Sequence, residues 1–345
     1  MKLLLDLGFW LGCAGLLYTA RQRVVFWPLL ALMLLLLFNR VWTPGFFDLG
    51  FRDGRIFGSV VDILNQGSKV MILSLGMTLV IATGGVDLSV GAVMAVAGAV
   101  GAQLGLSDLP GPLILTIALA VGLAAGLWNG GLVAGLGIQP IIATLVLMVA
   151  GRGVAQLVTA GQIIDLKNPL LIFLGNGTVA GLPFPVLVVA GMFGFTAWLT
   201  RRTALGLFIE AAGDNERASY ASGVPVRAIK FWVYGFCGLC AGMAGLLAAS
   251  NIKCADANHA GLYLELDAIL AVVVGGTALT GGRFYLTGSL VGALLIQTLT
   301  TTMYARNVSA EVAPVPKALV IIAVCLLQSE KFRERVRPWG RRPAV

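Results

Sequence analysis

The sequence predicts an all-α fold: a polytopic transmembrane helical bundle of about ten spans, with the N and C termini cytoplasmic. The hydrophobic fraction is 58% and the charged fraction only 12%. A soluble domain carries roughly 25% charged residues, so this chain of 345 residues cannot cover itself with a water-facing surface. Its 45 glycines indicate close helix packing, which small residues permit in a bilayer. The lipid bilayer is therefore the expected surroundings of most of the chain.

The chain begins with a leader, residues 1–23, whose apolar part is short and is interrupted by Asp6. The apolar core of a signal peptide is the alternative, but Arg21 and Arg23 follow directly and no small-residue cleavage site is evident. We expect an interfacial or cytoplasmic leader. About 20 apolar residues cross the hydrocarbon core as a helix. Read on that scale, the spans are predicted at roughly 24–42, 63–83, 88–106, 111–136, 139–159, 183–200, 226–250, 265–281, 285–304 and 315–330.

Basic residues set the predicted orientation of these spans. Most of the 24 lysines and arginines fall in the leader, in the stretch 201–230, at Arg283 and in the basic tail 331–345, all predicted to be internal. The others, Lys69 and Arg152 among them, scatter over external loops and span ends. Basic residues concentrate on the cytoplasmic side of membrane proteins, which places both termini inside and requires an even number of spans. The net charge of +8 thus marks topology, and no nucleic-acid partner is predicted.

Residues 1–345 form a single transmembrane domain in this reading. Its longest polar internal connection, 201–230, contains Ala-rich runs broken by Gly213 and Gly223. We expect two short helical pieces that a soluble partner can grip to rotate the attached spans; a simple solvated loop is the alternative. A weak internal echo relates 84–91 to 275–282. It suggests duplicated halves with broken helices, although chance matches are frequent in a chain so rich in Gly, Ala and Val.

Catalytic motifs are not evident. The chain has no Gly-x-x-x-x-Gly-Lys-Ser/Thr loop for ATP phosphates, no Ser-His-Asp set and no paired carboxylates. Cys237 and Cys240 lie one helical turn apart in an apolar run, where packing is the favoured interpretation, and the lone His259 cannot make a metal cluster. We therefore predict no metal, no cofactor and no enzymatic activity. An ion gradient or another subunit must supply the energy for any transport.

Polar residues inside the spans are the candidates for a transport pathway. The span middles are nearly free of the acidic and His residues that an ion-coupled carrier is expected to use. Arg152 is the most deeply placed charge: it either lines a polar cavity or snorkels and pairs near a helix end. Neutral polar side chains and one aromatic ring suit a sugar-like ligand, and each serves equally well as a contact between helices. These candidates are Asn65, Gln66, Trp128, Asn129, Gln139, Gln162 and Gln297.

Three separated segments give the chain a family resemblance. TGGVDLSVG at 83–91, the stretch 201–224 and LELDAILAVVVGG at 264–276 together resemble the permease subunits of bacterial ribose-type sugar ABC transporters. The resemblance covers about 57–328. Within that family the chain looks most like the galactofuranose permeases, through residues 149–157, 255–258, 260–262 and 281–284. The leader and the stretch 298–313 match poorly, which leaves the exact partner and the substrate open.

The resemblance implies a multi-subunit importer in the bacterial inner membrane. Two permease subunits, different from each other in galactofuranose systems, would form the pore. Two ATP-binding ABC subunits would dock inside, and a periplasmic binding protein would deliver the sugar. The resemblance also assigns residues. The motif and gating residues would be Gly84, Gly85, Asp87, Ser89, Glu265 and Asp267. The coupling residues facing the ATPase would be Gly206, Glu210, Gly213, Asp214, Asn215 and Gly223.

Three function classes remain to be compared. The leading hypothesis is the permease of an ATP-driven monosaccharide importer, with galactofuranose as the implied sugar. The runner-up is an ion-coupled secondary transporter of a small polar solute, against which the acid-poor span centres argue. A membrane enzyme or structural scaffold would need a catalytic cluster at an interface, and the sequence contains none.

Overall fold

The structure is a computed structural model that describes residues 25–52, 55–309, 312 and 314–328. The predicted leader 1–23 and the basic tail 331–345 lie outside the described residues. The described chain is predominantly helical and contains three pairs of very short antiparallel strands. Its first part has the elements α2 (Phe26–Trp42), β1 (Gly50–Arg52), β2 (Arg55–Phe57), α3 (Ser59–Ala82), α4 (Val90–Leu104), α5 (Gly111–Gly130), the π-helical turn η1 (Gly131–Gly135) and α6 (Pro140–Val158).

The second part continues the helical pattern. Its elements are β3 (Ile164–Asp165), α7 (Pro169–Asn176), β4 (Thr178–Val179), β5 (Leu182–Pro183), α8 (Phe184–Arg202), α9 (Leu205–Asp214), α10 (Glu216–Ala221), α11 (Val226–Ile252), β6 (Cys254–Ala255), α12 (Leu264–Val274), α13 (Leu286–Ala305) and α14 (Pro314–Gln328). β1 pairs with β2, β4 with β5, and β3 with the distant β6. The pairing of Ile164 with Ala255 therefore joins the loop after α6 to the loop after α11.

Six described segments are long and apolar enough to cross a membrane: α3, α5 with η1, α6, α8, α11 and α13. The other four predicted spans coincide with shorter helices, namely α2, α4, α12 and α14. The predicted bounds 265–281 are wrong at the C-terminal end, because α12 has only 11 residues and ends at Val274. The chain then turns through a glycine-rich junction, residues 275–282, before α13. A membrane helical bundle is thus confirmed.

Glycines bring α5 and α11 into backbone contact. Gly122, Gly126 and Gly130 recur every four residues on α5, and a Cβ at any of them would collide with the backbone of α11. Gly238 of α11 faces Gly122 and Gly126 in return. Rows of small residues at this spacing allow such close approach between membrane helices. The predicted role of the glycine excess is therefore visible at this pair of helices.

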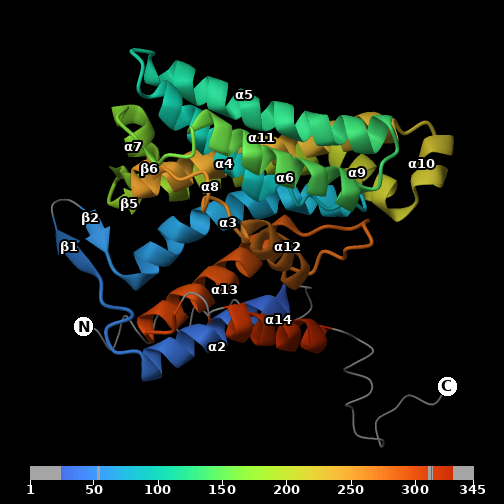
Figure 1. The fold of residues 1–345 in the computed structure, drawn as a ribbon. Coiled ribbons are helices and arrows are strands. Elements are labelled where there is room, and N and C mark those ends of the chain that lie inside the picture. The colour runs from blue at the N-terminus through green and yellow to red at the C-terminus, as the bar shows by residue number, and fades with distance from the viewer. Residues whose placement is uncertain (1–24, 53–54, 310–311, 313, 329–345) are drawn as a thin grey trace, which may run out of the picture.

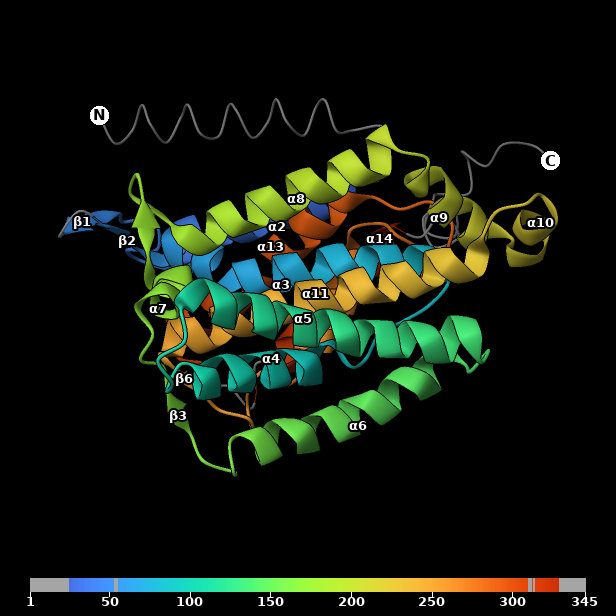
Figure 2. The same cartoon turned by 90° about the horizontal axis from the view of Figure 1, so that it is seen from above.

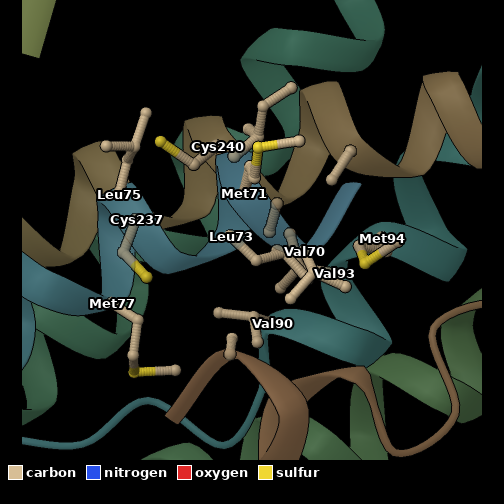
Figure 3. Packing of buried hydrophobic residues seen from close by; sticks show 14 of the residues in the cluster. Val70, Met71, Leu73, Leu75, Met77, Val90, Val93, Met94, Cys237 and Cys240 are labelled. Atoms are coloured by element: carbon tan, nitrogen blue, oxygen red, sulfur yellow. The ribbon is translucent and has the colours of Figure 1, made fainter. Parts of the chain in front are cut away.

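The core of the bundle surrounds α3. Most of the second half of this helix is buried, and Figure 3 shows Leu75 and Met77 beside Cys237 and Cys240 of α11. Both cysteines are free and fully buried, in agreement with the packing interpretation. Val90 of α4 joins the same cluster.

The helices divide into two groups around α3. Figure 1 shows α4, α5, α6 and α11 on one side of it and α2, α13 and α14 on the other. Figure 2 shows α9 and α10 at one end of the long helices, and α7 with the β1–β2 hairpin at the opposite end. The two ends therefore carry different structures, and the polar stretch 201–230 supplies one of them.

Candidate coupling site and transport pathway

The stretch predicted to contact a soluble partner folds into α9 and α10. The Asn215 side chain accepts a hydrogen bond from the Ala218 amide (3.0 Å) and so caps α10. The Ser219 hydroxyl donates to the Ala211 carbonyl (2.7 Å), which fastens α10 to α9. The stretch thus contains two short helical pieces, as predicted, and is not a simple solvated loop.

α9 touches both glycine-rich junctions of the bundle. Gly213, near the end of α9, packs so tightly that a Cβ there would collide with the carbonyl oxygen of Ala82 and with the amide of Gly282. The Gly282 amide in turn donates to the Ala82 carbonyl (2.9 Å). A Cβ on Gly281 would likewise meet the backbone of Gly84. The fold therefore brings together three segments that the sequence presents separately: the end of α3, the junction after α12 and the end of α9.

The two junctions share one backbone geometry. Gly84 ends α3 with φ +78°, and Gly276 ends the α12 segment with φ +96°. The amides of Gly84 and Gly276 each bond to the carbonyl three residues earlier. The following amides, of Gly85 and Thr277, each bond to the carbonyl five residues earlier, which is the Schellman pattern. The equivalence pairs Gly84 with Gly276, one residue later than the sequence echo, which pairs Gly84 with Gly275.

A buried polar cluster ties the first junction to α5. One carboxylate oxygen of Asp87 accepts from the Ser89 amide (2.9 Å) and from the Ser89 hydroxyl (2.6 Å). The Asn129 amide nitrogen donates to the Ser89 hydroxyl (2.9 Å). All three residues are at most 1% exposed. The structure thus unites two predicted gating residues with a predicted pathway residue, in a cluster that holds helices together.

The other two predicted gating residues lie at the start of α12. Asp267 accepts from the Lys317 ammonium at 2.9 and 3.0 Å, which links α12 to α14 through a largely buried ion pair. Glu265 lies against Gly91 at the start of α4, where a Cβ would collide with its carboxylate. Both carboxylates therefore join α12 to neighbouring helices.

Arg152 holds the loop that follows α11. Its Nη1 donates to the carbonyls of Ala257 (3.0 Å) and Ala260 (2.6 Å), while the charge of Glu265 attracts the guanidinium. One turn later, Gln156 donates to the side-chain oxygen of Asn258 (2.8 Å). The pairing interpretation of Arg152 is therefore the arrangement observed, and the half-buried guanidinium fixes the loop 256–261 on α6.

Asp256 stabilises the same loop from within. Partial burial raises the pKa of this carboxyl, but hydrogen bonds from the His259 ring and from the amides of Asn258 and His259 outweigh it, so the pKa lies below its usual value. The His259 Nδ1 is 2.8 Å from the Asp256 carboxylate. The loop 256–261 is therefore an organised turn between α11 and α12.

The remaining predicted pathway residues do not converge on one site. Gln139 immediately precedes α6 and Gln162 follows it, so the two exposed side chains lie at opposite ends of that helix. Trp128, near the end of α5, is 62% exposed. Asn65 lies in the first half of α3, and its Oδ1 is buried without a hydrogen-bond partner. Together with Asn129 and Arg152, these residues are spread through the molecule.

The predicted coupling residues, in contrast, all lie on or beside α9 and α10. Gly206 and Gly213 pack against other backbone segments, and Glu210 is half-buried. Asp214 and Asn215 are exposed at the break between the two helices. Gly223 follows α10 with φ +85° and has open space around it. These residues therefore lie together at one end of the bundle, with Gly206 and Gly213 packed inward and Asp214 and Asn215 exposed.

One residue was placed wrongly by the sequence reading. Lys69 was assigned to the external loops and span ends, but it is the eleventh of the 24 residues of α3. The signal was available in Val60 and Val61, two apolar residues that extend the helix at its N-terminal end. A charge that far inside a spanning helix is a functional candidate by default.

Comparison with known proteins gives a consistent answer. Residues 59–327 match the family model described as "Branched-chain amino acid transport system / permease component". The chain is 51% identical to the galactofuranose transporter permease protein YtfT of Escherichia coli (strain K12), over 91% of this chain and 94% of that protein.

Two further relatives carry the names of sugar permeases. The fructose import permease protein FruF of Bifidobacterium longum (strain NCC 2705) is 40% identical over 92% of this chain and 91% of its own length. The ribose import permease protein RbsC of Escherichia coli (strain K12) is 36% identical over 88% of this chain and 93% of its own length. No solved structure is a significant match.

Proposed function

This chain belongs to the branched-chain amino acid transport system / permease component family, and on that premise we propose that it conducts galactofuranose across the bacterial inner membrane. It is a permease subunit of a ribose-type sugar ABC importer. ATP hydrolysis takes place on separate ATP-binding subunits, and a periplasmic binding protein is the source of the sugar. The 51% identity to a galactofuranose permease, against 40% and 36% for the fructose and ribose permeases, favours galactofuranose among the three sugars.

The observation that carries the proposed ATP-driven transport is the contact of α9 with both glycine-rich junctions, residues 84–91 and 275–282. The Gly282 amide is bonded to the Ala82 carbonyl, and Gly213 packs against both. A force on α9 therefore acts at once on the end of α3 and on the segment between α12 and α13. Since packed interfaces switch between discrete arrangements, such a contact can convert a movement of a soluble subunit into a rearrangement of spans.

The proposed docking surface for the ATP-binding subunit is the outer face of α9 and α10. A groove of about 650 Å³ there is lined by Asn215, Glu216, Arg217, Tyr220, Val226 and Arg227. Tyr220 is 70% exposed and Leu207 of α9 is 68% exposed. Exposed tyrosines beside arginines are typical anchors of protein interfaces. The Lys230–Glu216 ion pair (2.7 Å) holds α10 against α11 and so supports this surface.

The proposed topology has ten spans with both termini in the cytoplasm. α9 and α10 then lie inside, and α7 with the loop 256–261 lies outside, toward the binding protein. A reporter that works only in the cytoplasm, fused after Val345, should be active; a silent reporter would place the C terminus outside and contradict this topology. The second permease subunit is proposed to be a different chain, so that the pore is a heterodimer.

Co-purification tests the assembly. When this chain is affinity-purified from a cell that expresses its neighbours, we expect an ATP-binding subunit and a second, different permease in the eluate. Recovery of this chain alone, together with sugar uptake that does not depend on ATP, would contradict the proposed function and favour an ion-coupled carrier.

A further inference from the structure

The first half of α3 carries a polar stripe that no other part of the mechanism uses. Asp62, Asn65, Gln66 and Lys69 follow at positions i, i+3, i+4 and i+7 of this helix. At 3.6 residues per turn these positions fall within an arc of about 100°. The stripe ends at Lys69, since Ile72 and Leu73, one turn further, are fully buried apolar residues. These four side chains thus form one polar face on the first half of the helix.

Lys69 lies deep in this stripe. Ten residues separate it from the start of α3, which corresponds to about 15 Å along a helix. The hydrocarbon core is about 30 Å thick, so in the proposed topology Lys69 lies below the outer membrane surface. None of the described carboxylates lies within 4.0 Å of its nitrogen. A cation without a carboxylate partner is energetically unfavourable inside the membrane, so such a residue is a candidate for a functional role.

The ammonium is instead surrounded by amide oxygens. Its Nζ donates to the Gln66 side-chain oxygen at 2.5 Å. When the Asn251 amide nitrogen donates to the Gly175 carbonyl (2.7 Å), the Asn251 oxygen accepts from Lys69 at 3.3 Å. An ammonium has three N–H donors, so the third remains for a ligand. One turn before it, the buried Oδ1 of Asn65 has no hydrogen-bond partner and can accept.

We propose that Lys69, Asn65, Gln66 and Asn251 form a binding subsite for the hydroxyl groups of the sugar on the outer half of its route, an inference that rests on the proposed function. A sugar hydroxyl both donates and accepts. One sugar hydroxyl can therefore accept from the Lys69 ammonium. A neighbouring hydroxyl can donate to the Asn65 Oδ1, one turn away. Neutral amides around the ammonium hold it in place without neutralising it, so a neutral polyol gains a charge-assisted hydrogen bond.

The position of the subsite suits a transport route. The first half of α3 lies between the group α4, α5, α6 and α11 and the group α2, α13 and α14 (Figure 1). Asn251 belongs to the end of α11, and Gly67, beside Gln66, packs against Gln297 of α13. A ligand held on this stripe would therefore touch the boundary between the two groups. The same α3 ends at Ala82, where α9 is attached.

Lys69→Met tests the subsite, because methionine keeps much of the length of the side chain and removes its charge. The matched control is Lys253→Met, at an exposed lysine two residues beyond Asn251. In proteoliposomes with the complete complex and loaded binding protein, we expect labelled galactofuranose uptake to fall about tenfold in Lys69→Met, the loss of one charge-assisted hydrogen bond. The control should match wild type. Binding-protein-stimulated ATP hydrolysis should persist, because the coupling contact is untouched.

Thermal stability separates binding from a structural role. Removing an unpaired charge from a membrane helix should leave the melting temperature of the purified complex unchanged or raise it. A Lys69→Met complex that melts lower or fails to assemble would make Lys69 structural, and a variant with wild-type uptake would exclude it from the route; both results overturn the inference. Should wild type itself take up no sugar, the proposed function fails instead.

Discussion

Replacing Gly213 by alanine tests the coupling contact with the smallest possible change. The glycine lies in the last turn of α9, and the new methyl group would point at the Ala82 carbonyl and the Gly282 amide. Both obstacles are backbone atoms held by their own hydrogen bond, so neither can rotate away as a side chain would. The substitution therefore has to move α9 relative to the two junctions.

The size of the effect follows from the clash. Overpacking a close contact typically costs about 1–3 kcal/mol. If that cost falls on the arrangement in which α9 engages both junctions, its population decreases by a factor of about 5–150. Intrinsic helix propensity works in the opposite direction, because alanine is better than glycine by about 1 kcal/mol in a helix interior and by less in a last turn. The methyl group therefore tests packing, since the helix itself is not weakened.

The assay compares sugar uptake with ATP hydrolysis in the reconstituted complex. Gly213→Ala should lose most uptake, while hydrolysis continues without stimulation by the loaded binding protein. Gly191→Ala is the matched control, because this glycine of α8 has nothing within 4 Å of its added Cβ. Wild-type uptake and wild-type stimulation in Gly213→Ala would refute the coupling role of the contact.

Four further substitutions test other parts of the account. Arg152→Ala removes the donor of two loop carbonyls and should lower uptake by at least about tenfold, because each hydrogen bond to a charged group contributes about 1.5–3 kcal/mol. Subunit assembly should stay intact; full uptake would leave Arg152 a structural role only. Glu210→Lys and Asp214→Lys reverse charges on the proposed ATPase face and should weaken copurification of the ATP-binding subunit; unchanged stimulated hydrolysis in both would move the contact elsewhere. Gly126→Ala pushes α5 from α11 and should destabilise the purified chain by about 1–3 kcal/mol, whereas Gly153→Ala, with open space at its Cβ, should melt like wild type.

Hydropathy was sufficient to locate the helices because the bilayer imposes a length on each span. It failed where glycines end a helix inside an apolar run. After Glu265 and Asp267 near its start the run 265–281 carries no charge, yet α12 ends at Val274, since Gly276 takes a positive φ and closes a Schellman turn. The internal repeat was misaligned by one residue at this junction. Comparison of the two sequence segments paired Gly84 with Gly275, whereas the backbone geometry pairs Gly84 with Gly276.

The candidate site could be predicted only as separate pieces. The glycine-rich junctions and the stretch 201–230 were each recognisable, but their meeting at Gly213 is a tertiary contact between backbones, and no pattern in a single segment encodes it. The partners of Arg152 are backbone carbonyls, which every residue possesses, so the sequence could not single them out. Lys69 was misplaced because α3 begins at Ser59, four residues before the predicted span.

Sugar uptake under two energy conditions tests the central claim most directly. Proteoliposomes containing this chain with its partner permease and ATP-binding subunits would hold ATP inside and receive binding protein with labelled galactofuranose outside. The account predicts accumulation that requires internal ATP and continues when an uncoupler abolishes ion gradients. Accumulation without ATP that collapses on addition of the uncoupler would contradict it and identify an ion-coupled carrier.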